Sequence, residues 1–145
     1  MNLENIFEEW EKDSKINRVE LGDAALEIPK LHHKYFKMMS GERLRLRKME
    51  SDHDELLRNK KEWLMGHLSK EELNELGWEA CLKSHLKSEL DDVLAKDKQV
   101  IESKLRLSYQ KEKVEVLNEI TKVINNRSFQ INSAIQWEKF KAGIG

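Results

Sequence analysis

Apolar residues recur along the chain at intervals of three and four positions, the spacing that gathers side chains on one face of an α-helix. The period-two alternation typical of strands is weak throughout. The pattern predicts an all-α domain spanning 1–145, with several helices, some of them long, and coiled-coil-like packing. The expected helices cover residues 3–14, 19–27, 29–64, 70–77, 78–95, 98–124 and 128–141.

Residues that favour helix ends separate these segments. Ser69 stands three positions before a glutamate, as in a capping box, and Asp97 can cap the helix that follows it. Gly66 is expected to end the longest helix, and Pro29 suits that helix's first turn. The pair 125–126 is Asn-Asn, which predicts a stop through left-handed backbone geometry.

Two of the expected helices are apolar on more than one side. One stripe of 98–124 contains Ile101, Leu105, Tyr109, Val116, Ile120 and Val123, and a second contains Val100, Leu107 and Val114. Two stripes on one helix imply two neighbours, so we predict self-association through residues 98–145. The alternative is an ordinary buried helix in a monomeric bundle. The candidate oligomerisation residues of the last helix are Phe129, Ile131, Ile135, Trp137 and Phe140.

Composition narrows the class of protein further. The 145 residues include one Pro and six Gly, too few for the turns of a sandwich or barrel. Cys81 is the only cysteine, so no intrachain disulfide can form, and a reducing compartment is expected. The sequence has neither a membrane-length apolar run nor the basic-then-apolar order of a signal peptide, which predicts a cytoplasmic location.

Charge is balanced overall, at a net −1, but is not evenly distributed. Residues 30–48 hold seven Lys or Arg against one acidic residue, Glu42. Aromatic residues interleave with the cations of 30–67, and charge with flat aromatic faces is what binding of single-stranded nucleic acid requires. The alternative is a solvated helix whose aromatic residues face the core. The candidate DNA-binding cations are Lys37, Arg43, Arg45, Arg47, Lys48, Arg58, Lys60 and Lys61.

Motifs for catalysis or cofactor binding do not occur in the sequence. The five histidines and the single cysteine lack the spacing of a metal site, and neither a phosphate-binding loop nor a dinucleotide fingerprint is found. Adjacent carboxylates are consistent with helix surfaces. We therefore expect a protein that is not an enzyme and that uses no metal or other cofactor.

The order of several features resembles the phage recombination mediator proteins of the UvsY type. The resemblance runs nearly end to end. It begins with Ala25, Pro29, Leu31, His33, Lys34 and Tyr35, continues with Arg58, Lys60, Lys61, Trp63 and Gly66, and ends with residues 127–135, Trp137, Phe140, Ala142 and Gly143.

The resemblance implies a specific biology in the host cell that the phage infects. Proteins of this type are helical homo-oligomeric rings that bind single-stranded DNA coated by the phage single-stranded DNA-binding protein. They weaken that coat and help to load a RecA-like recombinase, and they are not enzymes. The family's DNA-binding positions match Arg58 and Lys60, and its C-terminal helix supports oligomerisation. The alternative class is a non-enzymatic structural or assembly adaptor protein of a phage, which gives the basic run no role.

Overall fold

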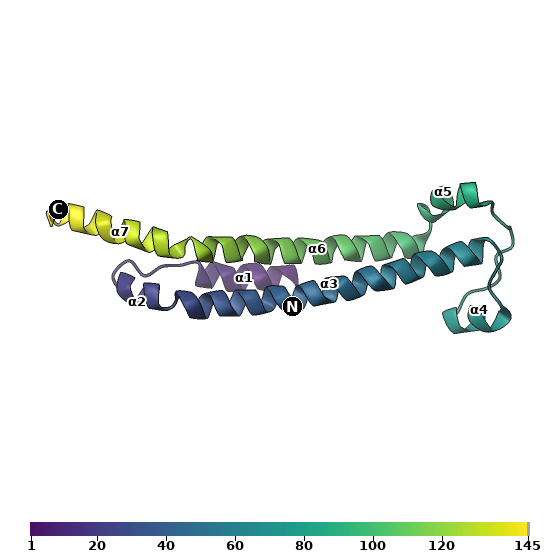
Figure 1. Ribbon diagram of the computed structural model, residues 1–145, viewed down its shortest axis with the longest axis horizontal. Coiled ribbons are helices and arrows are strands. Elements are labelled where there is room, and N and C mark those ends of the chain that lie inside the picture. Colours follow the sequence, from purple (N-terminus) through teal and green to yellow (C-terminus); the bar gives the residue numbers. More distant parts are fainter. Residues whose placement is uncertain (145) are drawn as a thin grey trace. The chain divides into compact units, whose positions relative to one another are not determined.

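The computed structural model describes residues 1–144, which contain helices and no strand. This confirms the all-α prediction. Figure 1 shows the elements along the chain. They are α1 (Leu3–Asp13), α2 (Leu21–Leu26), α3 (Ile28–Leu64), α4 (Lys70–Leu76), the 3₁₀ turn η1 (Lys87–Glu89), α5 (Leu90–Leu94), α6 (Lys98–Asn125) and α7 (Arg127–Lys141). In the described part of the chain, no helix has the length and apolar content needed to cross a bilayer.

The helices form two compact units. Unit 1 consists of Met1–Leu44 and the chain from Gln110 onward, and unit 2 consists of Arg45–Tyr109. Both α3 and α6 contribute to each unit, because each helix runs through a unit boundary.

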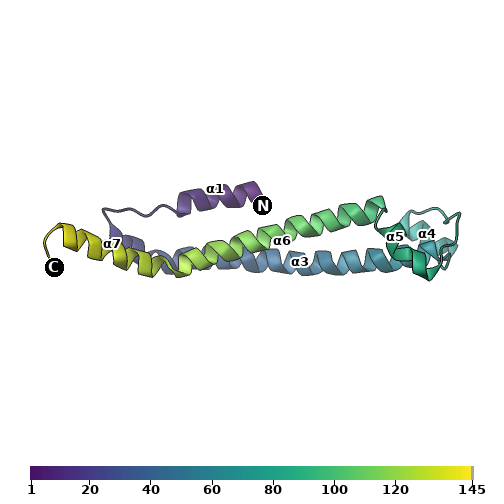
Figure 2. The same cartoon turned by 90° about the horizontal axis from the view of Figure 1, so that it is seen from above.

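The core of unit 1 joins α1 to the first part of α3 and the last part of α6. Trp10 meets the ring of Tyr35 edge-on, with 5.4 Å between the ring centroids. α7 packs beside α2, and Figures 1 and 2 both show this pairing. The buried residues of the core are Ile6, Tyr35, Met39, Leu117, Ile120 and Ile124.

Polar contacts fix the C-terminal end of α1. The carboxylate of Asp13 accepts hydrogen bonds from Lys34 Nζ, at 2.5 Å, and from Tyr35 Oη, at 2.8 Å. Arg127 Nη2 donates to the main-chain carbonyls of Asp13, at 3.0 Å, and Ser14, at 2.8 Å. A cation here also suits the negative end of the helix dipole. The first residue of α7 therefore holds the last turn of α1.

These contacts shift the pKa of several groups. Burial acts to raise the pKa of Asp13, but the hydrogen bonds from Lys34 and Tyr35 outweigh it, and the pKa lies below its ordinary value. Burial likewise acts to lower the pKa of Lys34, and its bonds to Asp13 and Glu9 reverse the direction and raise it. Burial lowers the pKa of Arg127, which remains a cation. The interaction between Asp13 and Lys34 is thus most favourable when the carboxylate and the ammonium are both charged.

Glu42, the one acidic residue of the basic run, is buried in unit 1. Its Oε2 accepts a hydrogen bond from Gln110 Nε2, at 2.7 Å, and lies 3.2 Å from Lys113 Nζ. Lys113 also donates to the carbonyl of Met1, at 2.9 Å. The carboxylate faces inward, and two side chains of α6 contribute to the compensation of its charge.

The core of unit 2 forms where α3 ends and α6 begins. His53 and Ser103 link the two helices through a hydrogen bond of 2.7 Å between Nδ1 and Oγ. α4 and α5 lie on opposite sides of the end of α3 (Figure 1). The buried residues of this core are Leu64, Leu90, Leu94 and Val100.

Most of the predicted helix ends are confirmed. Ser69 forms the capping box, and Asp97 Oδ1 accepts a hydrogen bond from the main-chain N–H of Val100, at 3.0 Å. Pro29 lies in the first turn of α3. Gly66 and Gly77 follow the ends of α3 and α4 in the left-handed region, with φ of 73° and 71°. An L-residue with a side chain would be strained there, so glycine is favoured at both turns.

Two local predictions are wrong. The helix expected over 78–95 is replaced by irregular backbone, η1 and the short α5, because groups in this segment bond to α3: the Glu79 carbonyl accepts from Trp63 Nε1, at 2.7 Å, and the N–H of His85 donates to Leu64, at 2.9 Å. The stop at Asn126 uses no left-handed residue. Its φ of −87° and ψ of −4° are right-handed, so the predicted stop is present without the expected geometry, and a single residue separates α6 from α7.

Candidate nucleic-acid interface

The cations of α3 in unit 2 mostly face solvent. Arg47 and Arg58 are exposed and stand eleven residues apart, about three helical turns, so they share one side of the helix. Lys61 follows Arg58 by three positions and is half-buried. Arg45 and Lys48 are exposed as well, and Lys48 pairs with Asp52 at 3.2 Å.

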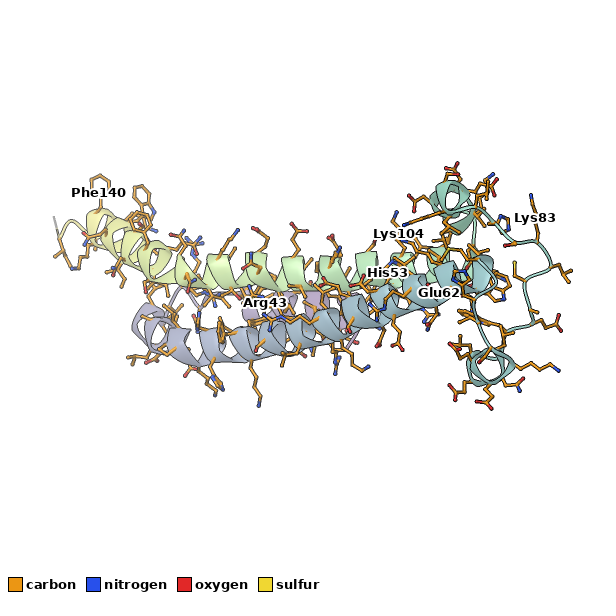
Figure 3. The ribbon with its side chains drawn as sticks, turned by 45° about the vertical axis from the view of Figure 1, so that its right-hand side comes forward. Arg43, His53, Glu62, Lys83, Lys104 and Phe140 are labelled. Carbon is orange, nitrogen blue, oxygen red and sulfur yellow. The ribbon has the colours of Figure 1, made fainter. Side chains whose placement is uncertain are left out.

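Unit 1 carries the remaining candidate cations. Lys37 and Arg43 are exposed on α3, and Figure 3 labels Arg43. Lys34, in contrast, is held by Asp13 and by Glu9, whose Oε2 lies 2.8 Å from Nζ. The cations of the basic run therefore divide into an outward-facing set and a set used within the fold.

Lys60 belongs to the inward-facing set. Only 6% of the residue is exposed, and its Nζ lies 3.1 Å from Asp97 Oδ2. The ammonium also lies over two indoles, 4.9 Å from the ring centroid of Trp63 and 4.4 Å from that of Trp78. The structure thus differs from the expectation of a solvent-facing cation here. The reason is helical phase: Lys60 precedes the core residue Leu64 by four positions and shares its face.

A cavity of about 480 Å³ lies beside Lys60. The two tryptophans form part of its wall, with ring centroids 6.0 Å apart and planes inclined at 59°. The irregular segment after α4 supplies the rest, including Ala80, Cys81 and Leu82. Sequence reasoning missed Trp78 and Asp97 as partners of Lys60. The available signal was Gly77, whose turn reverses the chain immediately before Trp78.

The candidate oligomerisation residues of α7 divide between its two sides. Ile131 is 1% exposed and Ile135 is half-buried, so this side is covered within the chain. That burial differs from the expectation that Ile131 takes part in the contact between chains. Phe129, Trp137 and Phe140 are 70%, 54% and 71% exposed. The rings of Trp137 and Phe140 stack at 5.6 Å, and Figure 3 shows Phe140 on the outer side of α7.

The two predicted stripes of α6 also have different surroundings. In the second stripe Val100 and Leu107 are buried, which assigns that side to packing within the chain. The first stripe is divided: Ile101, Leu105 and Tyr109 are exposed, by 42%, 65% and 46%, whereas Ile120 is 4% exposed and belongs to the core of unit 1. Large apolar side chains at successive turns of one helix face are typical of a surface that another chain covers.

Within residues 1–144, no group of three or more His, Cys, Asp or Glu side chains is arranged to hold a metal ion. Titratable groups with shifted pKa values cluster at the end of α1, where they are paired in ion pairs and hydrogen bonds. The surface of the described residues includes outward-facing cations on α3 and exposed apolar residues on α6 and α7.

The helical fold is that of phage recombination mediators. Crystal structures of the bacteriophage T4 recombination mediator protein UvsY match with TM-scores of 0.84 (lattice type II), 0.84 (type IV) and 0.81 (type I). Their identities to this chain are 23%, 21% and 21%, over 98%, 97% and 94% of this chain and 98%, 99% and 98% of theirs.

The sequence match defines the family. The family model described as "Recombination, repair and ssDNA binding protein UvsY" matches residues 9–144, and the chain belongs to the UvsY family. The search of curated proteins found no match. The resemblance seen in the sequence is therefore confirmed, and the role of the chain lies in phage DNA recombination and repair.

Proposed function

We propose that this protein is a non-enzymatic recombination mediator. It binds single-stranded DNA as a homo-oligomeric ring, destabilises the coat of phage single-stranded DNA-binding protein and promotes loading of a RecA-like recombinase. The observation that carries the proposal is the outward-facing set of cations on α3, in a chain that belongs to the UvsY family. Phosphate contacts from such cations bind DNA without reading its sequence.

Within unit 2, Arg47, Arg58 and Lys61 are the cations best placed for phosphates. They lie outside the core and have no ion pair among the described residues. Asp54 is exposed on α3 between Arg47 and Arg58, so the local field is not uniformly positive. Each chain then contributes a modest electrostatic attraction, and several chains around one strand multiply it through effective concentration.

The exposed aromatic side of α7 supports assembly. Phe129, Trp137 and Phe140 present large apolar surfaces that burial between chains would stabilise. We assign this side of α7 to the contact between protomers, together with the exposed residues Ile101, Leu105 and Tyr109 of α6.

A groove in unit 1 suits α7 of a neighbouring protomer. Its volume is about 300 Å³, and its apolar wall includes Phe7, Trp10 and Val123. Three exposed glutamates line it as well, and the end of α7 carries two exposed lysines. One glutamate pairs with Lys122 and one lysine with Glu138 on their own helices, so the other two glutamates and Lys139 supply the complementary charge. A contact between two different surfaces of identical chains generates a ring when the rotation closes. The glutamates are Glu112, Glu115 and Glu119, and the lysines are Lys139 and Lys141.

The test of the proposal is binding of a labelled single strand, measured by fluorescence anisotropy across a salt series on protein of known oligomeric mass. We expect binding that tolerates any base sequence and weakens steeply with salt. Order-of-addition assays with the phage single-stranded DNA-binding protein and the recombinase then test mediation. Absence of single-strand binding at low salt would reject the proposal in favour of the adaptor class.

A further inference from the structure

The cavity beside Lys60 has the chemistry of a site for a flat, uncharged ring. Two indoles contribute to its wall, Ala80, Cys81 and Leu82 add apolar surface, and Lys60, Gly77 and Glu79 complete the lining. Leu82 is fully exposed, with no cover from the chain itself. The volume of about 480 Å³ falls within the range of small-molecule pockets, which is about 300–1,000 Å³.

The indoles are held in place before any ligand arrives. Trp63 Nε1 donates to the carbonyl of Glu79, at 2.7 Å, which fixes the ring of Trp63 against the irregular segment. Trp78 follows the left-handed Gly77, and its main-chain N–H donates to the carbonyl of Leu73, at 3.0 Å, which fixes the backbone that carries the second indole. A preformed aromatic wall loses little conformational entropy when a ring stacks on it.

The charge of Lys60 does not make the cavity a phosphate site. Its ammonium is compensated by Asp97, at 3.1 Å, and is only 7% exposed as a side chain. A phosphate would have to compete with that carboxylate in a desolvated position. An uncharged aromatic ring makes no such demand, because it needs only an apolar or π face.

A strand that passes this cavity also finds a cation for its backbone. Lys83 extends from the irregular segment one residue after Leu82, and Figure 3 shows it away from the helices. The cavity and a solvent-facing cation therefore adjoin along the same stretch of chain. Stacking faces beside backbone-binding cations are the combination that single-stranded DNA uses.

We propose that the cavity bounded by Trp63, Trp78 and residues 80–82 binds one unstacked nucleobase of single-stranded DNA. The inference rests on the proposed function and adds a base-binding site to the phosphate contacts of α3. Since every base has a π face, the site accepts any of the four bases. In this arrangement Lys60 and Asp97 are positioning residues, which hold the indoles and the start of α6 together beneath the base.

The experiment compares two single strands of equal length and charge: oligo(dT) and a fully abasic strand. For the wild-type oligomer we expect tighter binding of oligo(dT). Trp78→Leu should weaken binding of oligo(dT) by about tenfold, as expected for loss of one base stack, and leave the abasic strand unchanged. Trp78→Phe, which keeps an aromatic face, should retain most of the difference and is the matched control.

The outcomes distinguish failure of the base site from failure of the proposed function, which is binding of single-stranded DNA. Equal binding of the two strands by wild type, or equal weakening of both by Trp78→Leu, overturns the base site and leaves DNA binding intact. Binding of neither strand overturns both. Ultraviolet crosslinking of oligo(dT) to the wild-type protein gives a readout that needs no variant: adducts should map to Trp63 or Trp78, and adducts confined to other peptides would refute the site.

Discussion

Lys60 and Asp97 form an ion pair of 3.1 Å that ties α3 to the start of α6. Asp97 Oδ2 pairs with the ammonium of Lys60, and Asp97 Oδ1 caps the first turn of α6 by accepting a hydrogen bond from the main-chain N–H of Val100. The lysine is therefore part of the structure that sets where α6 begins. A variant at this position tests folding first and DNA binding second.

Replacing Lys60 by alanine should destabilise unit 2 by about 3 kcal/mol, because the carboxylate of Asp97 is left without its buried partner. Urea unfolding followed by circular dichroism measures this change. Arg58→Ala is the matched control, since Arg58 is exposed and should change stability by less than about 0.5 kcal/mol. Equal stability of the two variants would show that the ion pair contributes nothing to the fold.

Arg58→Ala should lower affinity for single-stranded DNA while leaving the oligomer intact. Loss of one phosphate contact should reduce the salt slope by about 0.7 per contact removed. Asp54→Asn should act in the opposite direction, because it removes a negative charge from the same helix. If the slope of Arg58→Ala equals that of wild type, the triple variant Lys37→Ala/Arg43→Ala/Arg47→Ala identifies whether the other cations carry the DNA.

Phe129→Ser with Phe140→Ser should dissociate the oligomer without unfolding the chain, since both rings are exposed on α7. Ile131→Ala should instead destabilise the fold, by about 2–4 kcal/mol, without acting directly on the contact between chains, because it leaves a cavity in a fully buried site. Sedimentation velocity and thermal melting separate the two effects. An unchanged sedimentation coefficient for the double variant would exclude this face of α7 from the interface.

Charge exchange tests the docking of α7 in the groove of unit 1. Glu115→Lys and Lys139→Glu should each weaken assembly by placing like charges together, and the double variant should recover part of the loss. The dissociation constant by sedimentation equilibrium is the readout. Additive losses in the double variant would mean that the two residues do not meet.

Acid should weaken unit 1 through Asp13. Its pKa is lowered in the folded state, so its contribution is present above its unfolded pKa, about 3.8, and is lost as pH falls through the lower folded value. The stability difference between wild type and Asp13→Asn should therefore be largest near pH 7 and should shrink below about pH 4. Urea unfolding at several pH values measures it. A difference that is constant with pH would contradict the linkage.

Features encoded by neighbouring residues were predictable from the sequence. The capping box at Ser69, the glycine turns at 66 and 77 and the position of Pro29 all depend on contacts within a few residues. The segment 78–95 was not predictable in the same way, because its backbone groups bond to Trp63 and Leu64 of another helix. The helical preference of neighbouring residues does not indicate that backbone groups will instead bond to a distant helix.

The candidate site shows the same distinction. The basic run in the sequence indicated which residues are charged, and most of them do face solvent. It could not indicate that Lys60 meets Trp78, eighteen residues later, and Asp97, thirty-seven residues later. Helical phase relative to Leu64 would have favoured an inward lysine, but only a partner with the opposite charge makes that position stable.

The contact of Arg127 with the end of α1 has a consequence for synthesis. Ribosomes make α1 first, and Tyr35 and Met39 of α3 follow soon after it, whereas the α6 residues that cover Ile6 and the arginine that holds Ser14 come more than a hundred residues later. During translation, the apolar face of α1 is therefore only partly covered and is more open to the chaperones and proteases of the host. The contacts that protect the first helix are complete only after Arg127 has left the ribosome.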